Sequence, residues 1–366
     1  MPLIRSSMVS VRAVSRALLL FVALAVAIVM AQPAGAAEKT SFKVAWSIYV
    51  GWMPWDYAGQ SGILKKWGDK YGIKIELTQI DYIESINQYT AGKYDACVMT
   101  NMDMLTIPSA GGVDSTALIV GDYSNGNDGV VLKGAGKKLA DIKGQSINLV
   151  ELSVSHYLLA RGLSTVGLAE KDIKVVNTSD ADIVAAFATP GVTSTVTWKP
   201  QLAEVMAMPK TSLVFDSSKI PGEILDLMVV NTATLKANPK LGKALVGAWY
   251  ETMALMQAKD AKTTAALELM AKASGTDLAG FKGQLATTYL YATPATAVAA
   301  TLSPDLVKKM DLVRKFSFDH GLLGEGAKTV DAVGIEFPGG TTLGDKANLK
   351  LRFDTTYMKM AADGKL

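Results

Sequence analysis

Short apolar runs alternate with stretches of helical spacing along most of the chain, and this alternation constrains the fold more than any other feature. Two early stretches, residues 56–71 and 83–91, have apolar residues at helical spacing, and each ends just before a glycine, Gly72 or Gly92. The expected strands are residues 42–48, 74–80, 96–100, 117–120 and 129–132. Strands that alternate with helices predict an α/β fold, in which helices cover the faces of a doubly wound sheet.

The alternation repeats after a turn rich in glycine and asparagine at residues 125–129, which is a candidate hinge. The second series of expected strands is 146–150, 173–176, 194–198 and 212–215. Helical spacing appears between them at residues 156–166 and 181–188. This second series predicts a second, smaller α/β unit.

A further apolar strand, residues 226–231, leads into two helical regions at 235–274 and 294–318. We expect these C-terminal helices to pack on the first unit, so that the chain forms two lobes with a ligand cleft between them. The expected divisions are residues 1–36 for a leader, 37–125 with 230–366 for the first lobe, and 126–229 for the second.

The first 36 residues have the composition of a secretory signal peptide. A basic start is followed by the uncharged apolar run 17–31, then Pro33 and the tripeptide Ala34-Gly35-Ala36, which fits an A-x-A cleavage site. A membrane anchor is the alternative, but a spanning helix needs about 20 apolar residues. We therefore expect a protein exported to the periplasm.

The charge balance argues against a nucleic-acid partner. The formal charge of +3 comes from Arg5, Arg12 and Arg16 in the leader, because without them the chain holds 34 basic and 34 acidic residues. A neutral chain lacks the basic surface that nucleic-acid binding requires.

Residues typical of metal, cofactor or catalytic centres are scarce. Cys97 is the only cysteine, and its apolar neighbours favour a place in the core. The two histidines, His156 and His320, have no spacing that puts a base beside a nucleophile. No nucleotide-binding, metalloprotease or regular calcium-loop motif is present. We therefore expect no cofactor, no metal and no enzymatic activity.

Large aromatic residues gather after the first expected strand, and α/β sheets bind ligands outside the carboxyl ends of their strands. Four of the six tryptophans fall between residues 46 and 67. Trp46 has the strand parity of its apolar neighbours, which favours the core, whereas Trp52 and Trp55 flank a proline in a loop, where ligand contact and core packing are equally plausible. The candidate ligand-binding aromatic residues are Trp46, Tyr49, Trp52, Trp55 and, after a strand of the second lobe, Trp198.

Carboxylates follow almost every expected strand. Asp81, Asp103 and Glu151 are candidate ligand-binding residues, and Asp122 occupies a similar position. Each one alone is explained by a helix cap or a turn. Together with tryptophan faces, they suit a cation with several N–H donors. Only three arginines follow the leader and none ends a strand, so an anion would depend on lysines and helix N-termini.

Several segments resemble the exported substrate-binding proteins of ABC importers, in the nitrate, sulfonate and taurine group. The resemblance covers roughly residues 43–235 and is carried by segments 49–55 (YVGWMPW), 87–96 (NQYTAGKYDA), 139–147 (LADIKGQSI) and 156–200. It implies a type II periplasmic binding protein fold, with two α/β lobes joined by two crossing strands. It also implies a monomer whose partners are a small-molecule ligand and an ABC permease in the inner membrane. Related folds occur in pyrimidine-forming enzymes of thiamine synthesis, which is the enzyme alternative.

Two departures from the family pattern bear on the ligand. Glu151 and the following LSVS stand where the family usually has a small Gly-Ser-Thr turn able to receive an anion, and Asp103 replaces an apolar or proline residue. The chain most resembles the branch that accompanies urea carboxylase genes, for which guanidine or urea is the implied ligand. Guanidinium suits converging carboxylates better than neutral urea, which leaves them uncompensated. Taurine, another sulfonate or nitrate is the alternative, and small alkyl cations remain open.

Overall fold

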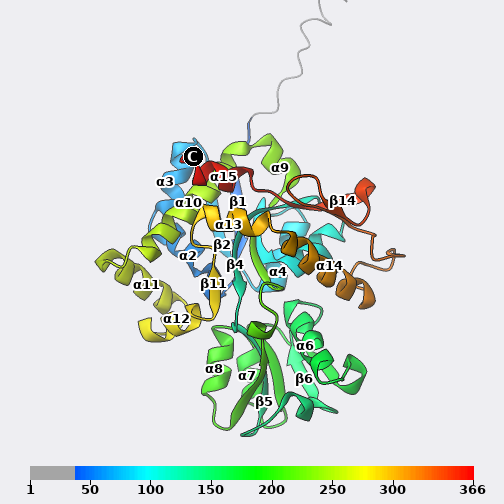
Figure 1. The fold of residues 1–366 in the computed structure, drawn as a ribbon. Coiled ribbons are helices and arrows are strands. Elements are labelled where there is room, and N and C mark those ends of the chain that lie inside the picture. The colour runs from blue at the N-terminus through cyan, green and yellow to red at the C-terminus, as the bar shows by residue number, and fades with distance from the viewer. Residues whose placement is uncertain (1–37) are drawn as a thin grey trace, which may run out of the picture. The chain divides into compact units, whose positions relative to one another are not determined.

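The computed structural model describes residues 38–366, so the expected signal peptide at residues 1–36 lies outside the described residues. Two β-sheets with helices packed around them form the architecture, which confirms the two-lobed α/β fold class (Figure 1). No helix within residues 38–366 is long and apolar enough to cross a membrane.

The first sheet joins the N-terminal and C-terminal parts of the described chain in the order β13-β12-β14-β4-β10-β3-β1-β2, with β11 paired to β4 outside this path. Its strands are β1 Ser41–Trp46, β2 Lys74–Gln79, β3 Ala96–Thr100, β4 Ser115–Ser124, β10 Leu225–Asn231, β11 Thr288–Leu290, β12 Gly334–Glu336, β13 Thr342–Leu343 and β14 Leu349–Phe353. β1 runs parallel to β2 and β3, whereas β10 runs antiparallel to both β3 and β4. Every residue of β3 is buried, as expected for a strand covered on both faces. Cys97 lies in this strand and is a buried free thiol, as the sequence predicts.

Helices pack around the first sheet and form the first lobe with it (Figure 1). They are α2 Met53–Gln60, α3 Ile63–Lys70, α4 Tyr82–Thr90, α5 Asn101–Met104, α9 Thr232–Ala237, α10 Pro239–Gln257, α11 Ala261–Ala273, α12 Leu278–Leu285, α13 Pro294–Thr301, α14 Pro304–Asp319 and α15 Thr356–Ala362, with the short helical turns η1 Val50–Trp52, η2 Leu105–Ser109 and η6 Lys346–Asn348. The long α10 begins with Pro239, which is favoured at a first helical position, and packs on α2 and α3. A Cβ on Gly247 of α10 would lie 2.4 Å from the Trp67 ring, so glycine permits this close contact. The C-terminal helices therefore complete the core of the first lobe.

The second sheet is built from one continuous stretch of chain in the order β7-β6-β8-β5-β9. Its strands are β5 Asp128–Lys133, β6 Ser146–Leu149, β7 Lys174–Asn177, β8 Ser194–Trp198 and β9 Thr211–Asp216. The helices of this second lobe are α6 Val154–Thr165, α7 Ile183–Ala188 and α8 Gln201–Ala207, with the short turns η3 Leu139–Ile142, η4 Glu170–Asp172 and, after β9, η5 Ser217–Lys219. β6 is parallel to β7 and β8, and β5 is antiparallel to β8 and β9.

Two connections join the sheets, at residues 125–127 and 217–224. They are tied to each other, because Ser217 Oγ lies 2.6 Å from Ser124 Oγ and accepts the N–H of Gly126 at 2.8 Å. Gly126 has φ 101°, a backbone conformation that favours glycine. The expected hinge at residues 125–129 contains the first connection, and the expected boundary at residue 230 lies inside β10.

Candidate functional site

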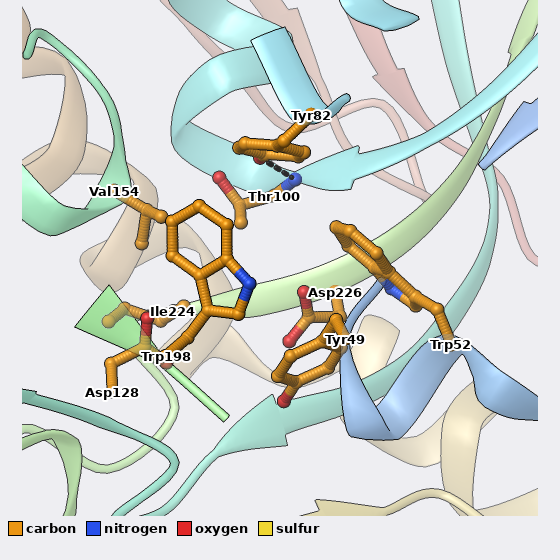
Figure 2. A pocket seen from close by; sticks show the side chains of 9 residues that line it. All are labelled: Tyr49, Trp52, Tyr82, Thr100, Asp128, Val154, Trp198, Ile224 and Asp226. Atoms are coloured by element: carbon orange, nitrogen blue, oxygen red, sulfur yellow. Dashed lines mark hydrogen bonds between the residues drawn. The ribbon is translucent and has the colours of Figure 1, made fainter. Parts of the chain in front are cut away.

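A pocket lies between the two lobes, where β1 and β3 of the first sheet end (Figure 2). Its empty space, part of which is open to solvent, amounts to about 260 Å³, and it is lined by Tyr49, Trp52, Tyr82, Thr100, Asp128, Val154, Trp198, Ile224 and Asp226. Asp128, Val154 and Trp198 belong to the second lobe and face side chains of the first (Figure 2). The carboxyl ends of sheet strands are where open α/β folds bind their ligands.

Four aromatic rings form a continuous wall of this pocket. Ring centroids are 5.1 Å apart for Tyr49 and Trp52, 5.6 Å for Trp52 and Tyr82, and 5.5 Å for Tyr82 and Trp198. Trp198 ends β8 of the second lobe, and its Nε1–H donates to the carbonyl of Ile48 in the first lobe at 3.2 Å. The aromatic wall therefore crosses from one lobe to the other.

Gly51 allows the first aromatic residue to reach the neighbouring carboxylate. A Cβ at position 51 would lie 2.4 Å from Cε1 of Tyr49 and 2.6 Å from Oδ2 of Asp122. Without that Cβ, the hydroxyl of Tyr49 donates to Asp122 Oδ1 at 3.0 Å. The close approach of these two side chains thus depends on glycine at this position.

Two carboxylates meet on neighbouring strands beside the pocket. Asp226 of β10 is the register partner of Asp122 of β4, and both are buried. The Oδ2 atom of each finds no donor among the described residues. Burial raises the pKa of both groups, and the charge of Asp122 raises the pKa of Asp226 further. A pair in this situation holds one shared proton more readily than two negative charges.

A third carboxylate, Asp128, comes from the start of β5. Burial raises its pKa to about 7, although a hydrogen bond from Ser124 and the charge of Lys199 act in the opposite direction. Burial also lowers the pKa of Lys199, whose Nζ donates to Thr287 Oγ1 at 2.8 Å. Lys199 therefore compensates the carboxylates only from a distance.

Asp103 lies directly behind the aromatic wall. Its Oδ2 accepts the hydroxyl of Tyr82 at 2.5 Å and that of Thr100 at 2.8 Å, while Oδ1 has no partner among the described residues. Burial raises the pKa of Asp103 to about 6, and these hydrogen bonds and the backbone N–H of Val154, at the start of α6, partly offset the rise. Asp103 therefore positions two lining side chains and faces the N-terminus of a helix from the other lobe.

The ionisable side chains of the pocket lining are acids. Asp128 and Asp226 are among its lining residues, which include no lysine or arginine. The arginines of the described chain pair with carboxylates elsewhere: Arg161 with Glu223, Arg314 with Asp311, and Arg352 with Asp114. Carboxylates removed from water are costly unless a cation compensates them. Within residues 38–366, no group of three or more His, Cys, Asp or Glu is arranged to hold a metal ion.

Four of the expected ligand-binding residues lie at the pocket or next to it. Tyr49, Trp52 and Trp198 line it, and Asp103 touches the lining residue Tyr82. Trp52 lines the pocket because the short η1 turn ends at this residue and holds its ring at the cleft before α2 begins.

The other four expected residues lie outside the pocket lining. Trp46 is buried and borders a groove between α2, α3 and β2. Trp55 is on the far side of the first turn of α2, where it stacks on Trp249 of α10 with ring centroids 5.0 Å apart. Asp81 and Glu151 are exposed, in the turns before α4 and α6. The structure thus places these tryptophans in the core and these carboxylates at the surface.

Six lining residues are not among the candidates from the sequence: Tyr82, Thr100, Asp128, Val154, Ile224 and Asp226. The sequence places Asp122 at the end of a strand but does not identify it as a site residue. Asp226 begins its expected strand, so a search of strand ends does not identify it. In an antiparallel neighbour, however, the start of a strand lies at the same edge as the ends of the others. The available signal was a carboxylate at the head of the apolar run DLMVVN, where a buried charge requires a partner.

Comparison with known proteins identifies the family of this chain. The family model described as NMT1/THI5 like matches residues 65–262, which is more than half of the chain. The chain belongs to the NMT1/THI5-like family. Comparison with curated proteins gave no match.

Several solved structures similar to this NMT1/THI5-like protein are of solute-binding proteins. The alkanesulfonate-binding protein SsuA from Xanthomonas axonopodis pv. citri, bound to MOPS, has a TM-score of 0.65 at 19% identity and covers 79% of this chain and 96% of its own. The periplasmic aliphatic sulphonate binding protein SsuA from Escherichia coli has a TM-score of 0.64 at 16% identity, covering 78% and 94%. The periplasmic nitrate-binding protein NrtA from Synechocystis PCC 6803 has a TM-score of 0.54 at 14% identity, covering 88% and 99%.

These similarities support the periplasmic binding protein fold that the sequence predicts. The three proteins named above are binding proteins. At these identities they concern the fold, and the chemistry of the pocket must be taken from its own side chains.

Proposed function

We propose that this protein is the extracytoplasmic solute-binding component of an ABC importer and that it captures a small cation rich in N–H donors, with guanidinium the best fit. The observation that carries this proposal is that two buried carboxylates, Asp128 and Asp226, line an aromatic pocket whose lining includes no lysine or arginine. Asp122 and Asp103 lie directly behind the lining, where they accept hydrogen bonds from Tyr49 and Tyr82.

The carboxylates supply the acceptors that such a cation needs. Apart from a proton shared between the two carboxyl groups, the buried Oδ2 atoms of Asp122 and Asp226 have no donor among the described residues, and neither has Oδ1 of Asp103. Charge-assisted hydrogen bonds from a guanidinium ion are stronger than neutral ones. They would also remove the cost of keeping these carboxylates away from water. Urea offers N–H groups but no charge, and its oxygen would need a donor.

The aromatic rings supply the second half of the recognition. Trp52, Tyr82 and Trp198 surround the pocket from both lobes (Figure 2). A planar cation over a tryptophan face is stabilised by about 0.5–2 kcal/mol, more when water is excluded. Because Trp198 belongs to the second lobe, stacking on it favours lobe closure.

Sulfonate or nitrate is the second candidate ligand, favoured by the binding proteins of that class among the structural neighbours. An anion would meet Asp128 and Asp226 at the pocket surface. Moreover, Asp103 already faces the backbone N–H of Val154 at the N-terminus of α6, a position that suits anions. The side-chain chemistry of this chain therefore favours the cation.

Capture would proceed by closure of the lobes around the ligand. Contacts between the lobes already include Trp198 Nε1 with the carbonyl of Ile48 and Asn127 Nδ2 with Thr288 Oγ1 at 2.6 Å. A ligand that touches both lobes shifts the population toward the closed state. The closed protein would then deliver its ligand to a permease in the inner membrane. The leader at residues 1–36 and the periplasmic neighbours support export to the periplasm.

A ligand panel tests this proposal. Thermal unfolding is measured with guanidinium, urea, taurine, an alkanesulfonate and nitrate, each below 1 mM, and with tetramethylammonium as a cation without N–H donors. A ligand at about 100 times its dissociation constant adds about 2.7 kcal/mol of stability. We expect a rise in melting temperature with guanidinium alone. A rise only with the sulfonate, taurine or nitrate would replace the cation with the second candidate.

A further inference from the structure

Both histidines of the chain contact one glutamate. His320 Nε2 lies 2.5 Å from Glu170 Oε2, and His156 Nε2 forms an ion-pair contact with Glu170 Oε1. The two imidazole rings are 6.0 Å apart. This cluster is separate from the pocket lining, and the ligand proposal does not use it.

The two contacts differ in what they join. Glu170 begins η4 and His156 lies in the first turn of α6, so both belong to the second lobe. His320 caps the C-terminus of α14, a helix held against the first lobe by a contact of Met310 Sδ with Asn101 Nδ2 at 3.4 Å. The His320 contact therefore crosses between lobes, whereas the His156 contact stays within one.

The two histidines differ in the hydrogen bond made by Nδ1, the ring nitrogen that does not face Glu170. His156 Nδ1 accepts the backbone N–H of Leu152 at 3.2 Å, so this nitrogen carries no hydrogen, and Glu170 Oε1 beside its Nε2 has no hydrogen-bond partner among the described residues. His320 Nδ1 lies 2.8 Å from the carbonyl of Phe316 while its Nε2 faces a carboxylate. Both nitrogens of His320 must carry hydrogen to satisfy these two acceptors, which only the imidazolium form does.

The surroundings of His320 reinforce its positive form. Its ring stacks on Phe316 with centroids 4.0 Å apart. The titratable groups that face it are Glu170 from η4, His156 from α6 and Asp319 from its own helix. The hydrogen bond with Glu170 is the main cause that raises the pKa of His320, with burial acting in the opposite direction.

The same contacts lower the pKa of Glu170. Burial alone would raise its pKa, but the contacts with His156 and His320 lower it to about 2. Glu170 is therefore ionised throughout the range in which histidine titrates.

We propose that His320 and Glu170 form a clasp between the lobes that favours the closed arrangement at acidic pH and loosens at alkaline pH. The pair is intact while His320 is protonated. Because its pKa is raised in the folded protein, the stabilisation is fully present below the ordinary histidine value of about 6.5 and is lost as the pH rises through the raised value.

The clasp adjoins the ligand cleft. Val154, which lines the pocket, is two positions before His156 in the same helical turn. Retention of this helix against α14 therefore keeps one wall of the pocket in place. The effect does not depend on which ligand the pocket takes.

Small-angle X-ray scattering of the purified, ligand-free protein at pH 5.5 and pH 9 tests the clasp. We expect a smaller radius of gyration at pH 5.5 for the wild type. The cleft carboxylates Asp103 and Asp128 also titrate in this range, so the decisive comparison is between variants measured at the same two pH values.

His320→Gln removes the contact between lobes, and His156→Gln removes only the contact within the second lobe. We expect His320→Gln to lose most of the pH-dependent change and His156→Gln to keep it, with both folded by circular dichroism. His320 has a side-chain exposure of 23%, which makes its replacement compatible with folding. Glu170→Gln, a second variant, should behave as His320→Gln does. A His320→Gln protein with the wild-type change, or a wild type without any change, would overturn the proposal.

Discussion

Asp226 of β10 and Asp122 of β4 lie directly opposite each other at the edge of the cleft, both buried and each with an oxygen that no donor satisfies among the described residues. Two adjacent buried carboxylates repel each other unless one is protonated or a cation lies between them. Under the proposed function a bound cation takes the place of the shared proton, and the first two predictions follow from this relationship.

Asp226→Asn should weaken guanidinium binding at least tenfold, because the lost charge-assisted contact corresponds to about 1.5–3 kcal/mol. The melting temperature of the ligand-free protein should be equal or higher, since the repulsion with Asp122 is removed. Isothermal titration calorimetry measures the affinity. Asp81→Asn is the matched control, because Asp81 is exposed outside the pocket and its replacement should leave affinity unchanged. Equal affinity in Asp226→Asn and wild type would exclude Asp226 from the site.

Binding of a cation should release protons. Burial raises the pKa of Asp128 to about 7 and also raises those of Asp122 and Asp226, whereas a bound cation favours their ionised forms. Guanidinium affinity should therefore increase from pH 5.5 to pH 8. Calorimetry in two buffers with different ionisation enthalpies measures the released protons, and identical heats in the two buffers would contradict the prediction.

The same groups should make the ligand-free protein less stable as pH rises. An acid whose pKa is higher in the folded state contributes stability below its unfolded value of about 4, and this contribution is lost as pH rises toward the folded value. For Asp128 the window runs from about pH 4 to about 7. The urea-unfolding free energy of wild type should fall across this window, and the fall should be smaller in Asp128→Asn.

Gly51→Ala should displace Tyr49 from its place in the cleft. The new Cβ would lie 2.4 Å from Tyr49 Cε1, so Tyr49 must move away from Asp122. We expect a destabilisation of about 1–3 kcal/mol, typical of overpacking, and weaker ligand binding. Gly283→Ala is the control, because a Cβ at this exposed position of α12 meets nothing within 4 Å. Denaturant unfolding compares the two, and equal stability would show that the η1 turn adapts.

Asp103 should affect ligand binding through Tyr82, whose hydroxyl it accepts. Tyr82→Phe removes the hydroxyl that donates to Asp103 and accepts the N–H of Thr100, but leaves the aromatic ring in the wall. We expect both Tyr82→Phe and Asp103→Asn to weaken guanidinium binding, and Tyr82→Phe to shift the pH profile of affinity upward because Asp103 loses a stabilising donor. Titrations from pH 5 to 8 test this. An unchanged profile in Tyr82→Phe would separate Asp103 from the site.

The sequence was sufficient for the fold class and for part of the pocket. The sequence predicts Tyr49, Trp52 and Trp198 as site residues because they lie at or just after the ends of expected strands, where open α/β sheets bind ligands. The structure has two helices, α2 and α3, where the sequence predicts one at residues 56–71. Ser61 caps the end of α2, and Gly62, with φ 82°, precedes α3. Local spacing predicts the helical region, but this break depends on one backbone conformation.

The remainder of the site depends on long-range packing. Trp52 and Trp55 are three residues apart with similar local sequence, yet only Trp52 faces the cleft, because Trp55 stacks on Trp249 from a distant helix. Asp226 and Asp122 become a pair through strand pairing that places β10 between β3 and β4. Residues close by in the chain can mark each carboxylate, but they do not show that the two are paired.

The position of β10 also imposes an order of assembly. This strand fills the gap between β3 and β4, yet the whole second lobe, from β5 to β9, comes before it in the chain. A chain that emerges from its amino terminus can complete the second sheet from contiguous residues while β3 and β4 still lack their shared neighbour. Long-range pairing of this kind is slow to form. The smaller lobe should thus act as the early-folding unit, and the larger lobe, with the carboxylate pair of the cleft, should mature last.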